Sequence, residues 1–503
     1  MKKTVLLTGP TGAMGKKVLE YLYKNIDEKT SIRLFVHNTP KDLKQIQKYK
    51  NLSNIEIIIG DLTNYLDAYK AVINVSMVLH VAALVSPLAD YNPSLAMEIN
   101  YGGTKNLIDA IINQGQIAKT KFVFIGTIAQ TGDRLPPIHW GRVGDPIKPS
   151  IFDYYAVSKV KAERYLIESD LKYWVSLRQT GIIGKEMYKK SDDAIMFHNG
   201  LNNVLEYISD NDSGKLLSNL WYKDLNNTLN PEFWNHIYNV GGGKSTRVDT
   251  ITLFENVYKI LGIKDLKYVI DPKLFASCNF HGTYYLDSDK LNDYLDFRSD
   301  SIEYFYSIVK KQLGFAGLVC RVISKFLGGH KIIGYFIKRR FNKIAKKQFG
   351  TLNFLENNLN PQINAYFESK EQWQAIPNEF SKFQRATNLD EIVQIDHGYD
   401  EGKSKDELSL QDLNKAVSFR GGTILSKNMI IGDWTTKLSF KCAFNHIFKA
   451  SPKLILEGGH WCNVCEDSSW NYDERAKRDK FFAQVWNPIR KSLNGIRIYQ
   501  KKY

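Results

Sequence analysis

The first 300 residues alternate short apolar runs with segments in which apolar residues recur at helical spacing. The apolar runs, which predict strands, span residues 4–8, 32–36, 55–59, 77–82, 122–127 and 174–177. In the segment after the first run, Val18, Leu19 and Leu22 share one helical face. This alternation predicts βαβ units, and therefore an α/β fold with a Rossmann-type, doubly wound parallel sheet.

Three glycines, Gly9, Gly12 and Gly15, separate the first predicted strand from the first predicted helix. At this spacing the first glycine permits a tight turn, the second lets the backbone approach a pyrophosphate, and the third lets helix and strand pack closely. An ordinary strand-to-helix turn is the alternative, but the regular flanks favour a dinucleotide site. The residues expected to bind the cofactor here are Thr8, Gly9, Thr11, Gly12, Ala13, Met14 and Gly15.

The ends of the second and third predicted strands bear on the type of cofactor. The second strand ends at His37 and Asn38, where an acidic residue would hold a ribose 2′-hydroxyl. No acid stands there, and His37 and Lys41 are candidate partners for a 2′-phosphate, so the pattern favours NADP while leaving NAD open. Asp61, followed by Leu62, ends the third strand, where its carboxylate would either accept a hydrogen bond from adenine or cap the next helix.

Candidate catalytic residues follow in the next predicted elements. Tyr155 and Lys159 are four residues apart in a helical segment, so their side chains share one face. A positive charge beside a phenol favours phenolate, which would make Tyr155 an acid or base nearer neutrality. The Thr127 hydroxyl would polarise a carbonyl or alcohol. Asn100, at the start of another helix, either supports catalysis or is a buried residue bonded to backbone.

These motifs together resemble the extended short-chain dehydrogenase/reductases, also called the NAD-dependent epimerase/dehydratase family. The residues that carry the resemblance, over about residues 1–300, are Thr8-Gly9-x-x-Gly12-x-x-Gly15, Gly60-Asp61, His80-x-Ala82-Ala83, Asn100-x-x-Gly103-Thr104, Thr127, Tyr155-x-x-x-Lys159 and Arg178. The sequence departs from the family pattern in two places. Thr127 replaces the usual serine but retains a hydroxyl, and Gln179 follows Arg178 where proline is common.

The resemblance implies roles for these residues. Tyr155 would be the acid/base, Lys159 would bind the nicotinamide ribose and tune Tyr155, and Thr127 would orient the substrate. Ala82, Ala83 and Arg178 would lie at the cofactor, which supplies the hydride chemistry. We therefore expect an oxidoreductase, epimerase or dehydratase that acts on a small carbonyl or alcohol, with sugar nucleotides among the candidates. The alternative is an NAD(P)-binding regulatory protein whose C-terminal module contacts a partner or nucleic acid.

Segments 128–153, 185–235 and 262–300 are expected to cover the substrate. The first of them contains Arg134, His139, Trp140 and Arg142, which offer polar and stacking groups close before Tyr155. Ion pairing at the surface is the favoured role for the two arginines. An anionic or aromatic substrate is the alternative explanation for them.

The net charge of +15 is concentrated in one part of the chain. Residues 301–350 contain eleven Lys or Arg against the single acid Glu303, a net charge of +10. Apolar residues recur at helical spacing between Leu313 and Gly350, which predicts two basic amphipathic helices, either at a membrane surface or packed against the enzyme. The second interpretation is favoured, so residues 301–385 are expected to form a basic helical connector between a first unit, residues 1–300, and a module at 386–503.

The C-terminal module contains a predicted metal site. Cys442, His446, Cys462 and Cys465 have the types and spacing of a closed tetrahedral zinc site, and the segment resembles zinc-ribbon or treble-clef α+β modules. His460 is a weaker candidate for the fourth ligand, and thiols without a metal are the other alternative. Four protein ligands leave no position for water, so the zinc would be structural. Lysines among aromatic residues leave a nucleic-acid surface open, but the sequence does not favour it.

Three further features bear on localisation. The five cysteines do not suit a secreted disulfide scaffold, and no apolar run reaches the roughly 18 residues of a membrane span. The basic N-terminus is followed by only a short apolar run, which does not indicate a signal peptide. We therefore expect a cytoplasmic protein, and the sequence leaves open whether it forms a homodimer.

Overall fold

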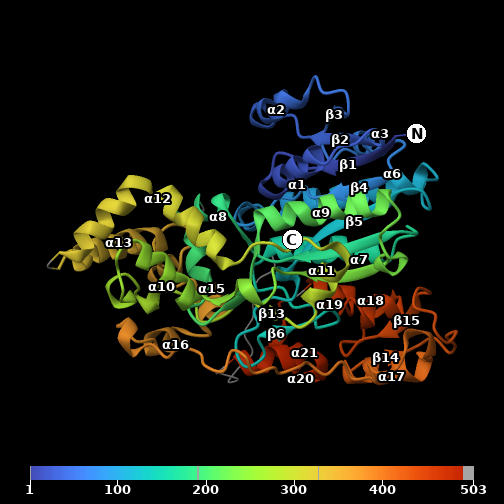
Figure 1. Cartoon of the computed structure of the whole chain (residues 1–503). Helices are drawn as coiled ribbons and strands as arrows, with labels where there is room; N and C mark the ends of the chain where they lie inside the picture. Colours follow the sequence, from blue (N-terminus) through green and yellow to red (C-terminus); the bar gives the residue numbers. More distant parts are fainter. Residues whose placement is uncertain (1, 190–191, 327, 469, 491–503) are drawn as a thin grey trace.

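A computed structural model describes residues 2–189, 192–326, 328–468 and 470–490 (Figure 1). At its centre lies a seven-stranded parallel sheet with the order β11-β7-β5-β4-β1-β2-β3. Its strands are β1 (Lys3–Thr8), β2 (Thr30–Val36), β3 (Ile55–Ile59), β4 (Met77–His80), β5 (Lys121–Thr127), β7 (Trp174–Gln179) and β11 (His236–Val240). The predicted Rossmann-type sheet is confirmed. Its strand order reverses between β1 and β4, which opens a crevice at their carboxyl ends.

Helices cover both faces of the sheet (Figure 1). One face packs against α1 (Ala13–Lys24), α9 (Asp210–Leu225) and α11 (Ser288–Leu295), and the other against α3 (Tyr65–Ala71), α6 (Gly103–Asn113) and α7 (Tyr154–Ile167). The predicted apolar face of the first helix is buried, since Val18, Leu19 and Leu22 lie in the first of these cores. Shorter helices in this part are α2 (Pro40–Ile46), α4 (Leu88–Tyr91), α5 (Pro93–Ala96) and the π-helical η2 (Met97–Gly102).

Small elements between residues 140 and 285 flank the carboxyl ends of the strands. They include β6 (Trp140–Gly141), β8 (Ile182–Ile183), α8 (Lys185–Lys189), β9 (Val204–Glu206), β10 (Ile208–Ser209), β12 (Arg247–Asp249), α10 (Thr250–Ile260) and β13 (Tyr284–Tyr285). They pair in three two-stranded sheets, β10 with β8, β12 with β9 and β13 with β6. Of these elements, β8, α8, β9 and α10 contribute residues to the wall of the cavity that continues the crevice.

The basic connector contains the two predicted amphipathic helices, α12 (Ile302–Lys325) and α13 (Gly329–Ala345). The first begins eleven residues earlier than Leu313, where its apolar pattern was expected to start, and bends at Gly314, whose φ is 49°. Phe305 and Val309 of α12 and Phe341 of α13 are buried against the rest of the protein. The helices α14 (Thr351–Glu356), α15 (Asn360–Phe367) and α16 (Lys370–Ala375) follow. No helix in the described part of the chain is long and apolar enough to cross a membrane.

The C-terminal module packs against the helical face of the sheet that contains α7. It consists of an antiparallel sheet of β14 (Thr423–Ile424), β15 (Leu438–Lys441) and β16 (Ile447–Ala450), with α17 (Leu410–Phe419), α18 (Pro452–Leu456), α19 (Asn463–Ser468), α20 (Tyr472–Arg478) and α21 (Lys480–Trp486). Leu166 of α7 and Phe122 of β5 belong to the same buried cluster as Phe440 and Leu454 of the module. The two ends of the chain therefore share one hydrophobic core.

A buried network of charged side chains crosses this contact. Glu163 of α7 accepts hydrogen bonds from the Arg178 guanidinium at 2.6 and 3.2 Å and from the Ser176 hydroxyl at 2.6 Å. Arg178 also donates to the carbonyl of Gly458 at 2.6 Å, and His460 Nε2 lies 3.0 Å from Glu163 Oε1. Burial would raise the pKa of Glu163, but Arg178 and His460 hold it well below its ordinary value. The carboxylate therefore stays ionised and joins α7, β7 and the module.

Removing the charge of Glu163 should destabilise the protein strongly. Glu163→Gln keeps the side-chain volume but leaves the buried Arg178 without its counter-charge, so we expect the free energy of unfolding to fall by about 3–5 kcal/mol. Chemical denaturation followed by circular dichroism measures this change. Glu379→Gln, which breaks an exposed pair with Lys382, is the control and should shift stability by less than about 0.5 kcal/mol. Equal effects of the two substitutions would contradict the role of the network.

Candidate functional site

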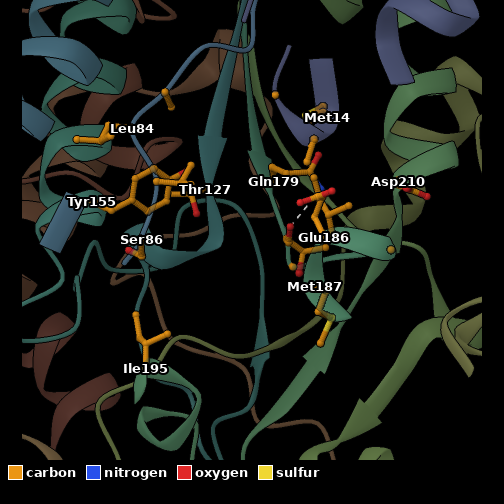
Figure 2. Close-up of a pocket in the computed structure, with 18 of the residues that line it drawn as sticks. Met14, Leu84, Ser86, Thr127, Tyr155, Gln179, Glu186, Met187, Ile195 and Asp210 are labelled. Carbon is orange, nitrogen blue, oxygen red and sulfur yellow. Dashed lines mark hydrogen bonds between the residues drawn. The ribbon is translucent and has the colours of Figure 1, made fainter. Parts of the chain in front are cut away.

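A cavity of about 1340 Å³ lies at the carboxyl ends of β1, β4, β5 and β7 (Figure 2). Fourteen of the predicted site residues line it: Gly9, Thr11, Gly12, Ala13, Met14, Gly15, His37, Asp61, Leu62, Ala82, Ala83, Thr127, Tyr155 and Lys159. The fold therefore brings the glycine loop and the predicted catalytic residues into one space. Thr8, Asn38, Asn100 and Arg178 do not line the cavity.

Away from the glycine loop, the cavity continues into a part with apolar walls, called here the apolar arm. This arm is lined by side chains of α10, α12 and α13, namely Leu253, Phe254, Val257, Phe305, Val309, Leu313, Ile337 and Phe341. Met187 and Tyr188 of α8 and Ile195 also line the cavity, so segment 185–235, which was expected to cover the substrate, contributes to its wall. Phe280 and His281 contribute from segment 262–300.

The glycine loop has the backbone geometry that its spacing predicts. Gly9 adopts φ of 65°, and a Cβ there would lie 2.8 Å from the Cα of Ala82. A Cβ on Gly15 would lie 2.0 Å from the carbonyl oxygen of Gly9, so close packing of α1 on β1 requires glycine. No side chain caps α1 at Gly12, so the first N–H groups of the helix lack a side-chain acceptor at the cavity wall. Such a helix terminus suits a pyrophosphate.

Thr8 lies beneath the loop and ties it to β4 through His80. The Thr8 hydroxyl accepts from the N–H groups of Val81 and Ala82, both at 3.1 Å, and lies 2.9 Å from His80 Nδ1. His80 Nε2 lies 2.9 Å from the Thr104 hydroxyl, which donates to a backbone carbonyl. Burial lowers the pKa of His80 to about 3, so the ring is neutral. Thr8 therefore positions the glycine loop without lining the cavity.

Asn100 also acts from outside the cavity. Its amide nitrogen donates to the Leu84 carbonyl and to the Ser158 hydroxyl, both at 2.9 Å, and its oxygen accepts from the Leu84 N–H at 2.8 Å. Ser158 in turn donates to the carbonyl of Tyr155 at 2.7 Å. Asn100 thus holds the segment after β4 against α7, which matches the sequence alternative of a buried residue bonded to backbone.

The end of β2 is arranged as a polar edge of the cavity. His37 Nε2 lies 3.6 Å from Asp61 Oδ2, and both side chains are exposed. The other oxygen of Asp61 accepts from the N–H and hydroxyl of Thr63, both at 2.9 Å. Asp61 does not cap the next helix, because Asn64 is the N-cap of α3. The helix-cap alternative for Asp61 is therefore wrong, and one of its oxygens faces the cavity edge.

Tyr155 and Thr127 lie side by side in the cavity wall, and Figure 2 places Gln179 and Glu186 across from them. Burial raises the pKa of the Tyr155 phenol above its ordinary value, although a hydrogen bond with Thr127 opposes this shift. The phenol is therefore protonated at neutral pH. In this state the phenol carries a proton, and Thr127 is its hydrogen-bond partner.

Lys159 differs from the sequence expectation in its contacts. Instead of activating the phenol directly, its ammonium donates to the Ile125 carbonyl at 2.8 Å and lies 4.7 Å from the centre of the Phe124 ring. Burial lowers the pKa of Lys159 to about 7, and the negative charge of Glu163 opposes that shift. Lys159 nevertheless lines the cavity one turn from Tyr155.

Arg178, which the family resemblance places at the cofactor, points away from the cavity. Its guanidinium is buried between Glu163 and the carbonyl of Gly458. The geometry therefore assigns it to the contact with the C-terminal module. Its neighbour Gln179 lines the cavity instead.

The loop of residues 133–145 is also absent from the cavity wall. Segment 388–398 covers it, and the Leu389 carbonyl accepts from His139 at 2.8 Å and from Trp140 at 3.2 Å. Arg134 is buried in an ion pair with Asp145 at 3.0 Å, and Arg142 pairs with a glutamate. Both arginines therefore form ion pairs, as expected, but the pair of Arg134 is buried rather than at the surface. Of segment 128–153 only Ile128 lines the cavity.

Two acidic residues near the site were not identified from the sequence. Glu186 of α8 lines the cavity. Asp90 accepts from the N–H groups of Tyr154 and Tyr155 at 2.9 and 3.3 Å, and burial, reinforced by Asp153, raises its pKa to about 7. Asp90 belongs to no local motif, because Tyr154 and Tyr155 lie more than 60 residues further along the chain.

The predicted metal ligands converge in the C-terminal module. The ligand atoms of Cys442, His446, Cys462 and Cys465 all lie within 4.8 Å of one another. The Cys442 and Cys465 sulfurs are 3.8 Å apart, and His446 Nδ1 lies 3.3–3.6 Å from the three sulfurs. A tetrahedral zinc at ordinary bond lengths separates two sulfurs by about 3.8 Å and a sulfur from a nitrogen by about 3.5 Å. The four groups therefore fit zinc.

His460, the alternative fourth ligand, lies outside this cluster between two carboxylates. Its Nε2 faces Glu163 and its Nδ1 lies 3.2 Å from Glu466 Oε2. Two of the module's lysines, which were considered as part of a nucleic-acid surface, form contacts within the chain instead. Lys437 donates to the Glu168 carbonyl and Lys453 to the Asn235 carbonyl. These contacts attach the module to the first unit.

Comparison with known proteins locates the similarity in the first part of the chain. Residues 6–204 match the model of the 3-beta hydroxysteroid dehydrogenase/isomerase family. An uncharacterized membrane protein of Methanocaldococcus jannaschii is 35% identical over 126 residues, which are 25% of this chain and 36% of that protein. UDP-glucose 4-epimerase of Rickettsia rickettsii is 32% identical over 128 residues, again 25% of this chain and 36% of the relative. The chain thus spans about a third of the length of these curated relatives.

A solved structure is also similar over part of the chain. A dTDP-glucose 4,6-dehydratase double mutant from Streptomyces venezuelae, with NAD and DAU bound, aligns with 61% of this chain and 96% of its own, at 17% identity and a TM-score of 0.49. The family-model match over residues 6–204 supports the predicted resemblance to the extended short-chain dehydrogenase/reductases in the first part of the chain.

Proposed function

We propose that the protein is an NAD(P)-dependent oxidoreductase, epimerase or dehydratase that acts on a carbonyl or alcohol. The observation that carries this proposal is the single cavity that contains the glycine loop together with Tyr155, Thr127 and Lys159. A regulatory protein that only senses the cofactor would not need these three groups there. Sugar nucleotides are the first substrates to test, because UDP-glucose 4-epimerase is among the relatives.

The residues present fit a dinucleotide. The close approach of Gly9 and Gly15 to their neighbours leaves no room for side chains, and the start of α1 offers N–H groups to a pyrophosphate. Ala82 and Ala83 keep the wall flat beside the loop. A bound nicotinamide would supply the hydride chemistry.

The protein's own part in the reaction is proton transfer. The protonated Tyr155 phenol would donate its proton to a carbonyl oxygen of the substrate, and in the reverse direction would take it back. The Thr127 hydroxyl, hydrogen-bonded to Tyr155, would hold the same oxygen. Lys159, close to its pKa at neutral pH, would add positive charge to the cofactor side of the cavity when protonated.

Loss of the Tyr155 hydroxyl tests this mechanism. Tyr155→Phe should retain cofactor affinity and lose at least about 10²-fold in turnover, because the acid/base is removed while the glycine loop is intact. Turnover is measured on a panel of sugar nucleotides that includes UDP-glucose, with product analysis by mass spectrometry. Tyr154→Phe, one residue away and outside the cavity lining, is the control and should retain turnover. Near-normal activity of Tyr155→Phe would refute the assignment.

We also propose a preference for NADP(H) over NAD(H). Two observations support this preference. No acidic residue stands at the end of β2, and His37 lies at the edge of the cavity. Lys41, four residues after His37, is exposed and is a second candidate partner for a 2′-phosphate. Fluorescence titration of the purified protein should give a lower Kd for NADPH than for NADH. His37→Asp should weaken NADPH binding about tenfold or more, because it sets a carboxylate against the 2′-phosphate. Equal or tighter NADH binding by the unaltered protein would sink the proposal.

The cysteine–histidine cluster is proposed to hold one structural zinc ion. Its four ligand atoms match tetrahedral spacing and leave no position for a reactive water. Metal binding would supply part of the folding free energy that a small module cannot gain from its own core.

Substitution of one ligand tests the zinc site. Cys462→Ser should lower zinc from about one equivalent per chain to a trace and should unfold the module. Elemental analysis of protein purified without chelator measures the metal. Cys320→Ser, outside the cluster, is the control and should keep its zinc. Less than about half an equivalent in the unaltered protein would count against the site. If the first unit folds independently of the module, Cys462→Ser should still bind NADPH in a titration. Loss of NADPH binding would show instead that the shared core makes the two ends of the chain one folding unit.

A further inference from the structure

The hairpin of α12 and α13 exposes a continuous set of apolar side chains. Along α12 they recur every three or four positions, so they form one stripe on the helix. The set has nine members. Six lie in or directly after α12, namely Phe315, Leu318, Val319, Val322, Ile323 and Phe326, and three lie in α13, namely Ile332, Tyr335 and Phe336. Phe315 is 79% exposed and Phe326 is 69% exposed. A set of this size on two adjoining helices marks an interaction surface.

Cationic side chains border this apolar stripe. Lys325 and Lys331 are exposed on either side of the turn between the helices, and Lys311 and Arg339 are exposed at the other end of the stripe. In residues 301–350, Glu303 is the single acidic residue against eleven cations. An apolar stripe bordered by Lys and Arg is the arrangement that binds the boundary between anionic headgroups and acyl chains.

The position of the hairpin allows a flat surface to reach it. Figure 1 shows α12 and α13 at the edge of the molecule, away from the central sheet and from the C-terminal module. A second copy of the chain is a poor occupant for this face. Symmetric pairing would oppose two segments that each carry a net charge of +10, and the charges would repel one another.

We propose that the α12–α13 hairpin docks the protein on the surface of an anionic lipid membrane. The contact is peripheral, because no helix in the described ranges has the length and apolar character to span a bilayer. The inner sides of the same two helices form the wall of the apolar arm of the cavity, through Val309 and Leu313 of α12 and Ile337 and Phe341 of α13. Docking therefore places that arm beside lipid, where a ligand with an apolar portion would be available.

Vesicle flotation of the full chain tests the docking, and it does not depend on the proposed enzyme activity. The probes are vesicles of phosphatidylcholine alone and of phosphatidylcholine with about 30 mol% phosphatidylglycerol. We expect binding to the anionic vesicles, little binding to the neutral ones, and release in about 0.5 M NaCl. Phe315→Ser/Phe326→Ser should reduce the bound fraction at least about tenfold, because two apolar side chains no longer enter the interface.

Two control variants separate the surface from general properties of the chain. Ile430→Ser/Ile447→Ser removes residues of the C-terminal module that are 76% and 69% exposed, and should bind vesicles as the unaltered protein does. Lys325→Gln/Lys331→Gln should weaken anionic binding, whereas Lys48→Gln/Lys427→Gln, also exposed, should not. Absence of vesicle binding, or equal loss in hairpin and control variants, would overturn the proposal. A dimer that dissociates in Phe315→Ser/Phe326→Ser would also overturn it, in favour of a second copy.

Discussion

The buried carboxylate of Glu163 is the interaction on which both halves of this protein depend. A lone carboxylate in an apolar interior is costly, and here it is stabilised by Arg178 and Ser176 of β7 and by His460 of the C-terminal module. Since Arg178 is satisfied in addition by the Gly458 carbonyl, the sheet and the C-terminal module are fixed to α7 at one point. The apolar core around this point continues from the sheet into the module without a break.

The same helix carries the candidate chemistry. Tyr155, Lys159 and Glu163 follow one another at intervals of four residues on α7, so they form a row from the cavity to the module contact. The charge of Glu163 opposes the effect of burial on the Lys159 ammonium. The protonation of a residue in the cavity wall is therefore linked to a network that residues 458–466 complete. Zinc, if bound, would sit in the module that supplies those residues.

Local patterns in the sequence predicted those features that depend on neighbouring residues. The strands, the glycine loop with its tight turn at Gly9, and the metal ligands were predicted because each is defined by short spacing along the chain. Arg178 was misplaced because its partner Gly458 is 280 residues away. The role of His139 was missed for the same reason, since Leu389 covers it from a segment with little regular structure. Contacts of this range leave no periodic signal, and only the fold reveals them.

The shared core has a consequence for how the chain is made. The side of α7 that bears Glu163 emerges from the ribosome long before residues 458–466 that cover it. At ordinary rates of about 5–20 residues per second, the interval lasts roughly 15–60 s. During this time the nascent protein exposes an apolar face and an incompletely paired charge network, which is the kind of surface that chaperones recognise. Shortening the chain from its C-terminal end would make that transient state permanent.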